Sequence, residues 1–251
     1  MIQVLQLKRL SLAGLLLLLG CKSQPSLPFT SAVLARVALE QLAYPPFLAQ
    51  PQTADRYRQQ GLDDRQRGDL DRAIATLKIA VALDPHSPGG YTILGWTQHL
   101  AGYRPDAIIT LHRALDQTPD FVPALNALGI VYLVEGDLVT AISTHNRAVT
   151  LQADNEVAHY NLSLAHQRLG QGQQAIAHGQ AATRLEPGNP HPWLALALAY
   201  RTAGDRNQAR SAYHHALTLD GGYRQPAYLN HLDRAGFSPD QIAAIATLAR
   251  E

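Results

Sequence analysis

The stretch Val122–Asn155, VPALNALGIVYLVEGDLVTAISTHNRAVTLQADN, decides the fold. Leu125, Leu128 and Tyr132 follow one another at helical spacing, and Gly136 then interrupts the pattern. A second run with helical spacing begins after this glycine. The stretch therefore predicts two short amphipathic helices joined by a tight turn. Neither helix could bury its apolar face alone, so the unit needs neighbours.

The same skeleton returns every 34 residues, which predicts units at 54–87, 88–121, 122–155, 156–189 and 190 to about 223. All five units share a turn glycine: Gly68, Gly102, Gly136, Gly170 and Gly204. Two alanine columns are also shared: Ala73, Ala107, Ala141, Ala175 and Ala209, then Ala80, Ala114, Ala148, Ala182 and Ala216. A small residue recurs in each first helix: Gly61, Gly95, Gly129, Ser163 and Ala197. We expect positive φ at the turn glycines and close helix approach at the small residues.

This pattern resembles the tetratricopeptide repeat family. Its motif residues in the fifth unit are Trp193, Leu196, Tyr200, Ala209, Tyr213 and Ala216, and its closing prolines are Pro85, Pro119 and Pro187. The resemblance implies an all-α fold. It implies a right-handed solenoid of about five helix-turn-helix repeats, with N- and C-terminal capping helices.

Residues 1–20 have the layout of a secretory signal peptide, since Lys8 and Arg9 precede an apolar run too short to span a bilayer. Leu18-Leu19-Gly20-Cys21 also resembles the bacterial lipobox. That resemblance implies cleavage before Cys21 and acylation of this cysteine, including palmitate, which anchors the chain in the lipid bilayer. Lys22 stands where the family's inner-membrane sorting signal has Asp, which favours the outer membrane, facing the periplasm. The alternative is an ordinary signal or an uncleaved anchor with a chance cysteine.

The remaining boundaries follow from composition and periodicity. Residues 21–28 are predicted to form a lipidated tether, and residues 29–53 an N-terminal capping helix or, alternatively, a partner-binding arm. The five repeats are predicted at 54–220 and two C-terminal capping helices, or a degenerate sixth unit, at 221–251. Ser238 to Gln241 has the residues of a helix start, with proline at the first helical position.

Composition suits one folded body rather than a disordered chain. The chain of 251 residues is 46% hydrophobic and 16% charged, with a formal net charge of +1. Such a neutral chain argues against nucleic acid as the main partner. One cysteine excludes an internal disulfide, and the sequence has no HExxH, CxxC, GxSxG or Walker motif. We therefore expect no cofactor and no enzyme activity.

Three histidines stand where the family places bulky apolar residues. His145 lies in the second helix of the third unit, and His159 and His166 lie seven residues apart in the next helix. Gly179 replaces another bulky residue and is expected to leave space. The three histidines predict a polar seam, hydrogen-bonded or water-filled, at the softest junction of the stack. A metal or pH-sensitive site is the alternative.

The family binds peptide segments or partner helices on the inner surface of its first helices. The matching inward positions here, which predict a partner-binding groove, are Arg58, Leu62, Arg65, Trp96, His99, Asn126, Ile130, Leu133, Tyr160, Asn161, Leu164, Gln167, Leu194, Leu198 and Arg201. Arg58 and Leu62 depart from the Lys/Asn clamp of co-chaperone members, so chaperone-tail binding is not expected. The apolar centre of the groove has a second interpretation, in which the chain's own capping helices pack into it.

Two functions follow as hypotheses. The first is a membrane-tethered scaffold that binds peptide segments or helices of other envelope proteins and assists their assembly or recruitment. It resembles the lipoprotein repeat proteins that help assemble type IV pilus secretins or dock peptidoglycan hydrolases. The second is an accessory subunit or weak metal-dependent enzyme using the histidine cluster, which a bound metal would distinguish.

Overall fold

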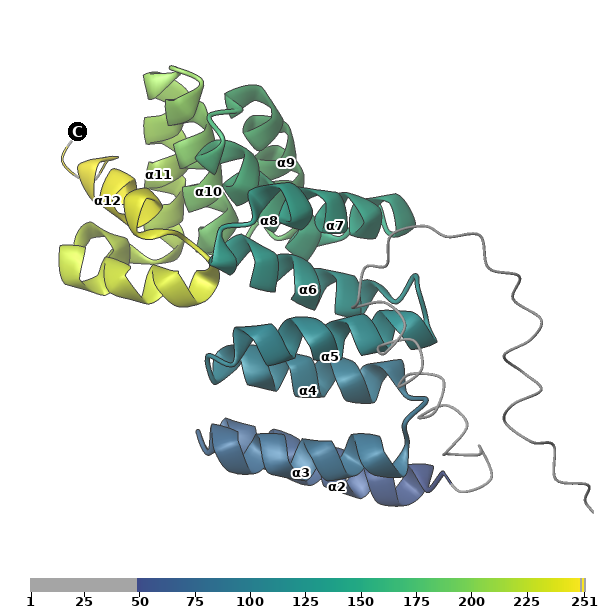
Figure 1. Ribbon diagram of the computed structural model, residues 1–251. Coiled ribbons are helices and arrows are strands. Elements are labelled where there is room, and N and C mark those ends of the chain that lie inside the picture. Colours follow the sequence, from purple (N-terminus) through teal and green to yellow (C-terminus); the bar gives the residue numbers. More distant parts are fainter. Residues whose placement is uncertain (1–48, 249, 251) are drawn as a thin grey trace, which may run out of the picture. The chain divides into compact units, whose positions relative to one another are not determined.

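The computed structural model describes residues 49–248 and residue 250. The predicted signal peptide, Cys21, the tether and residues 29–48 of the predicted N-terminal capping helix lie outside these residues. The described part contains five helix pairs: α2 (Pro51–Gln66) with α3 (Leu70–Leu83), α4 (Pro88–Leu100) with α5 (Arg104–Gln117), α6 (Val122–Glu135) with α7 (Leu138–Leu151), α8 (Glu156–Arg168) with α9 (Gly172–Leu185), and α10 (Pro190–Thr202) with α11 (Arg206–Leu219). The all-α prediction is confirmed (Figure 1).

The first repeat helix begins at Pro51, three residues before the predicted boundary. None of the helices in residues 49–248 is long and apolar enough to cross a membrane.

The predicted turns are present in all five pairs. Gly68, Gly102, Gly136, Gly170 and Gly204 each have φ between 71° and 87°, in the left-handed region that favours glycine. An aspartate follows three of these glycines and caps the second helix, as where the Asp137 carboxylate accepts from the Thr140 N–H at 3.1 Å. The turn therefore provides hydrogen-bond partners for the backbone groups at the end of the first helix and at the start of the second.

The pairs stack through both helices. Each second helix contacts the first helix of the next unit, and neighbouring first helices touch, so that α2, α4, α6, α8 and α10 form one continuous row. The two alanine columns lie inside the stack, with exposures of 0–1%. They allow the close helix approach that the sequence predicts.

Within each pair a small residue of the first helix receives a bulky residue of the second. A Cβ added to Gly61 would lie 2.6 Å from Leu77 Cγ, and one added to Gly95 would lie 2.7 Å from Leu111 Cγ. His145 occupies the same position over Gly129. The fourth unit is the exception, because Ser163 and Gly179 are both small and Leu196 of α10 lies against Gly179.

The space expected beside Gly179 is filled, so that prediction is wrong. A Cβ on Gly179 would lie 3.0 Å from Ser163 Oγ and 3.1 Å from Leu196 Cδ1. Ser163 Oγ also donates to the carbonyl oxygen of Ala175 at 2.9 Å. The missing side chain allows α10 to pack closely on α9.

After α11 the chain forms the C-terminal segment, residues 221–248. It consists of the 3-10 helices η3 (Gly221–Arg224) and η4 (Pro226–Ala235), followed by the α-helix α12 (Pro239–Leu248). Two helices were predicted here, but the structure gives the first one i to i+3 hydrogen bonding, as between Tyr228 N–H and Gln225 O. The predicted start of α12 is confirmed: Ser238 N–H donates to Gln241 Oε1 at 2.9 Å, and Gln241 N–H donates to Ser238 Oγ at 3.3 Å.

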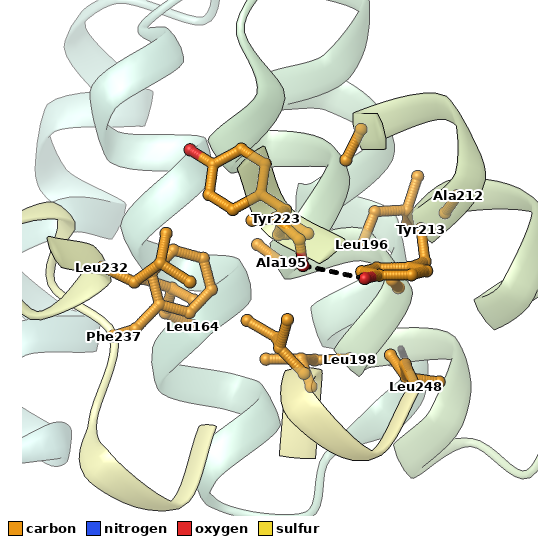
Figure 2. Packing of buried hydrophobic residues seen from close by; sticks show 14 of the residues in the cluster. Leu164, Ala195, Leu196, Leu198, Ala212, Tyr213, Tyr223, Leu232, Phe237 and Leu248 are labelled. Atoms are coloured by element: carbon orange, nitrogen blue, oxygen red, sulfur yellow. Dashed lines mark hydrogen bonds between the residues drawn. The ribbon is translucent and has the colours of Figure 1, made fainter. Parts of the chain in front are cut away.

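The C-terminal segment folds back over the row of first helices. Leu232 and Phe237 lie beside Leu164 of α8, and Leu248 lies near the same core (Figure 2). A Cβ on Gly236 would lie 3.8 Å from Leu133 of α6 and from Leu164. The segment therefore covers the first helices of the third, fourth and fifth units, not the last repeat alone.

Candidate functional site

An open pocket lies where the C-terminal segment stops covering the row of first helices. Trp96 of α4, Ile130 of α6 and Tyr160 of α8 line it on the repeat side, and Ala235 and Gly236 close it on the other. Its volume is about 230 Å³. Because the first helices of the second, third and fourth units each contribute a residue, the helix stacking itself positions the pocket. We call it the Trp96 pocket.

Trp96 lies half-buried at one end of this pocket, with His99 beside it. The two ring centroids are 5.0 Å apart. Burial, followed by the charge of Arg104, lowers the pKa of His99, so this ring is neutral at pH 7. His99 Nδ1 is buried without a hydrogen-bond partner among residues 49–248.

Asparagines support the wall formed by α6 and α8. Asn126 and Asn155 exchange two side-chain hydrogen bonds of 3.1 and 3.2 Å, and Asn155 Oδ1 also caps α8 by accepting from Ala158 N–H. Asn161 donates to the carbonyl oxygen of Val157 at 2.8 Å and lines the pocket. These bonds fix the spacing between the two first helices.

Charged residues at the pocket differ from the sequence prediction. Glu156 and Glu186 line it on the repeat side and Arg234 lines it on the side of the C-terminal segment. None of the three lies at a predicted inward position. Glu156 and Glu186 fall at the ends of helices, and Arg234 lies after the five repeats. Two carboxylates against one guanidinium give the repeat side a local negative charge.

The predicted N-terminal arginines do not reach this pocket. Arg58 pairs with Asp84 at 3.3 Å and with Asp55 in its own helix. Arg65 lies in the last turn of α2 and partly buried, away from the pocket lining. The first unit therefore lies apart from the Trp96 pocket.

The prediction that Leu133, Leu164, Leu194 and Leu198 line an open groove needs correction. These leucines are 0–1% exposed and belong to one core cluster with residues of the C-terminal segment. The apolar centre is thus covered by the chain's own C-terminal helices, as the second interpretation of the sequence proposed. The cause is hydrophobic: a row of leucines facing water is less stable than one buried under another apolar face.

Polar contacts hold the C-terminal segment in place. Tyr160 Oη donates to Ala235 O at 2.5 Å, Gln241 donates to Leu164 O and to Gln167 Oε1, and Arg201 donates to Ala244 O at 2.8 Å. Burial raises the pKa of Tyr160 well above its ordinary value, so its hydroxyl stays a donor. Three predicted groove residues, Tyr160, Gln167 and Arg201, thus bind the chain itself.

The three predicted histidines do not form one cluster. His145 is 0% exposed and lies over Gly129, and neither of its ring nitrogens has a hydrogen-bond partner in the described part of the chain. Burial lowers the pKa of His145 to about 3, opposed by the Gly129 backbone. The ring is therefore neutral and fills a position that leucine holds in the first two units.

His159 and His166 instead meet His178 of α9, which sequence reasoning missed. His159 Nδ1 lies 3.0 Å from His178 Nδ1, and the His166 and His178 rings stack with centroids 5.5 Å apart. Burial, followed by the charges of His159 and His166, lowers the pKa of His178 to about 4. Within residues 49–248, no group of three or more His, Cys, Asp or Glu residues is arranged to hold a metal ion. The feature of the sequence that could have identified His178 is its position directly before Gly179.

Stacked helix pairs with a period of 34 residues, packed through columns of small residues, define an α-helical repeat protein. Residues 190–223 match the family model described as tetratricopeptide repeat. The fifth helix pair therefore matches a tetratricopeptide repeat, and the four pairs before it share its turn glycine and its two alanine columns. A search of curated proteins gives no match.

Solved structures have the same fold. A crystal structure of MamA is 27% identical, covers 64% of this chain and 94% of that chain, and has a TM-score of 0.57. MamA residues 41 to end from Desulfovibrio magneticus RS-1 is 21% identical over 66% of this chain and 94% of that chain, with a TM-score of 0.59. YrrB, described as a TPR protein with an unusual peptide-binding site, is 19% identical over 66% of this chain and 85% of that chain, with a TM-score of 0.54.

Proposed function

We propose that the protein is a membrane-tethered scaffold that binds peptide segments or helices of other envelope proteins. The Trp96 pocket carries this proposal, since it is an open, largely apolar site built from several repeats. The peptide-binding site described for YrrB supports a binding role for the same fold. The lipobox at Cys21 supports the tether, and Lys22 supports the outer membrane, facing the periplasm.

The second hypothesis, a metal-dependent or accessory enzyme, required the predicted histidines to act together. His145 is buried over Gly129, whereas His159 and His166 meet at His178. No observation favours that hypothesis, and we propose a binding role without chemistry of its own.

Trp96→Ala is expected to abolish partner capture while the chain stays folded. Trp96 is half-buried at the pocket, and truncating an aromatic anchor costs at least about 2 kcal/mol of binding, some thirtyfold in affinity. The measurement is crosslinking and pull-down from intact cells, with circular dichroism to check helical content. Tyr160 is left intact, because it also holds the C-terminal segment.

Trp193→Ala provides the matched control. Trp193 lies in α10 against His215, with ring centroids 3.9 Å apart, and does not line the Trp96 pocket. We expect this variant to recover the same partners as the wild type. Equal recovery by both tryptophan variants would place recognition elsewhere on the molecule.

Cys21→Ser is expected to give an unprocessed or released protein. Three acyl chains on one cysteine should hold the protein firmly, whereas a single chain binds membranes only marginally. Fractionation and the mass of the mature N-terminus measure the outcome. Lys22→Asp should retain lipidation and move the protein to the inner-membrane fraction. Persistence of a cleaved, membrane-bound Cys21→Ser protein would contradict the anchor.

A further inference from the structure

We propose that the Trp96 pocket takes one large apolar side chain from a peptide that carries lysine or arginine beside it. This inference rests on the proposed function and specifies the chemistry of the ligand. Trp96, Ile130 and Tyr160 form the apolar surface, and Glu156 and Glu186 supply the charge.

The size of the pocket limits how much of the ligand can enter it. Its volume of about 230 Å³ is below the range of about 300–1,000 Å³ typical of small-molecule sites. It suits a single bulky side chain, with the rest of the ligand outside. Trp96, Ile130 and Tyr160 come from α4, α6 and α8, so a peptide lying across the row of first helices would place one side chain here.

The two glutamates define where the cation lies. Glu156 is the first residue of α8 and Glu186 caps the end of α9, so both come from turns at one edge of the row. Glu186 accepts from Asn189 Nδ2 at 2.7 Å, which orients its carboxylate. Glu156 has no ion pair among the described residues. Both side chains are half-buried, and a charge-assisted hydrogen bond there is stronger than one in open solvent.

Arg234 determines the polarity of the site. It lines the opposite side of the pocket, is exposed, and makes no ion pair with Glu156 or Glu186 in the described structure. Its charge disfavours a second cation on the side of the C-terminal segment. The ligand's basic residue is therefore expected on the glutamate edge alone.

Fluorescein-labelled peptides of about twelve residues test the proposal, with binding to the purified protein measured by fluorescence anisotropy. One set carries a central Leu or Phe flanked on one side by Lys, and two further sets replace Lys by Ser or Glu. We expect Lys-flanked peptides to bind at least about tenfold more tightly than Glu-flanked ones, with a difference that shrinks as salt increases.

Variants assign this preference to the glutamates. Glu156→Gln with Glu186→Gln should remove the difference in affinity between the Lys and Glu peptides. Trp96→Ala should weaken all three sets. Asp116→Asn, which removes an exposed carboxylate of α5 outside the pocket, should retain the preference.

Equal affinities, a preference for Glu-flanked peptides, or no binding of any set at about 1 mM would overturn the inference. A preference that survives the double glutamate variant would also overturn it. If Trp96→Ala loses its cellular partner while the peptides show no charge preference, this inference fails and the proposed function stands. If Trp96→Ala recovers the partner at wild-type yield, the proposed function itself fails.

Discussion

Gly129→Leu is expected to destroy the folded state of the central repeats. A Cβ at this position would lie 2.5 Å from His145 Nε2, closer than real Cβ contacts come, and leucine adds three more carbons. His145 is fully buried and cannot move aside. Overpacking typically costs about 1–3 kcal/mol, and this substitution should exceed that range. Urea unfolding followed by circular dichroism measures the loss.

Two variants of the same pair control for this result. Gly129→Ala should be milder, because the fifth unit pairs Ala197 with Tyr213 at the equivalent positions. Adding His145→Gly to Gly129→Leu should restore part of the stability, since it removes the imidazole that a side chain at position 129 would overlap. A Gly129→Leu protein as stable as the wild type would contradict the packing described for this column.

His145→Leu is expected to flatten the loss of stability in acid. His145 has a folded-state pKa of about 3, below the unfolded value of about 6.5, so the unfolded chain binds the proton more strongly. Stability is therefore complete above about pH 6.5 and falls as the pH drops towards 3. The loss from this histidine is about 2 kcal/mol at pH 5 and about 4 kcal/mol at pH 3.

The comparison between wild type and variant isolates this effect. His178 also has a lowered pKa, of about 4, and contributes to the acid dependence of both proteins. The equivalent positions in the first two units are leucines, Leu77 and Leu111. The substitution also removes the two buried ring nitrogens of His145, which have no hydrogen-bond partner in the described structure. We therefore also expect a higher melting temperature at pH 7. Parallel stability curves between pH 7 and pH 4 would show that His145 does not titrate on unfolding.

The repeat fold follows from sequence because it depends on local geometry. A glycine such as Gly136 is required where φ is positive, and an alanine such as Ala141 is required where helices touch. Both requirements recur every 34 residues and so appear as columns. The sequence does not say what covers an apolar face, so the position of the C-terminal segment over Leu164 and Leu198 remained one of two interpretations.

The candidate site was predicted in part for the same reason. Trp96, Ile130, Tyr160 and Asn161 line the pocket, and all four are among the inward positions that the family resemblance implies. The two glutamates come from helix ends, where periodicity assigns no face. His178 was missed because the histidines were selected only at positions where the family has bulky apolar residues. His178 lies next to such a position, Gly179, and not at one.

The return of the C-terminal segment across the first helices changes how the molecule should unfold. Repeat stacks in which each unit touches only its neighbours tend to melt from their ends, unit by unit. Here Tyr160 bonds to Ala235, 75 residues away, and Gln241 bonds to Leu164, 77 residues away. These long-range contacts join the third, fourth and fifth units in one cooperative block.

The first two units lie outside that block. Leu77 and Leu111 belong to separate, smaller clusters. Their amides should exchange with solvent at lower free energy than those of α8 and α10. During synthesis the block cannot close until η4 and α12 have left the ribosome, so the third to fifth units complete their folding only after α12 has been translated.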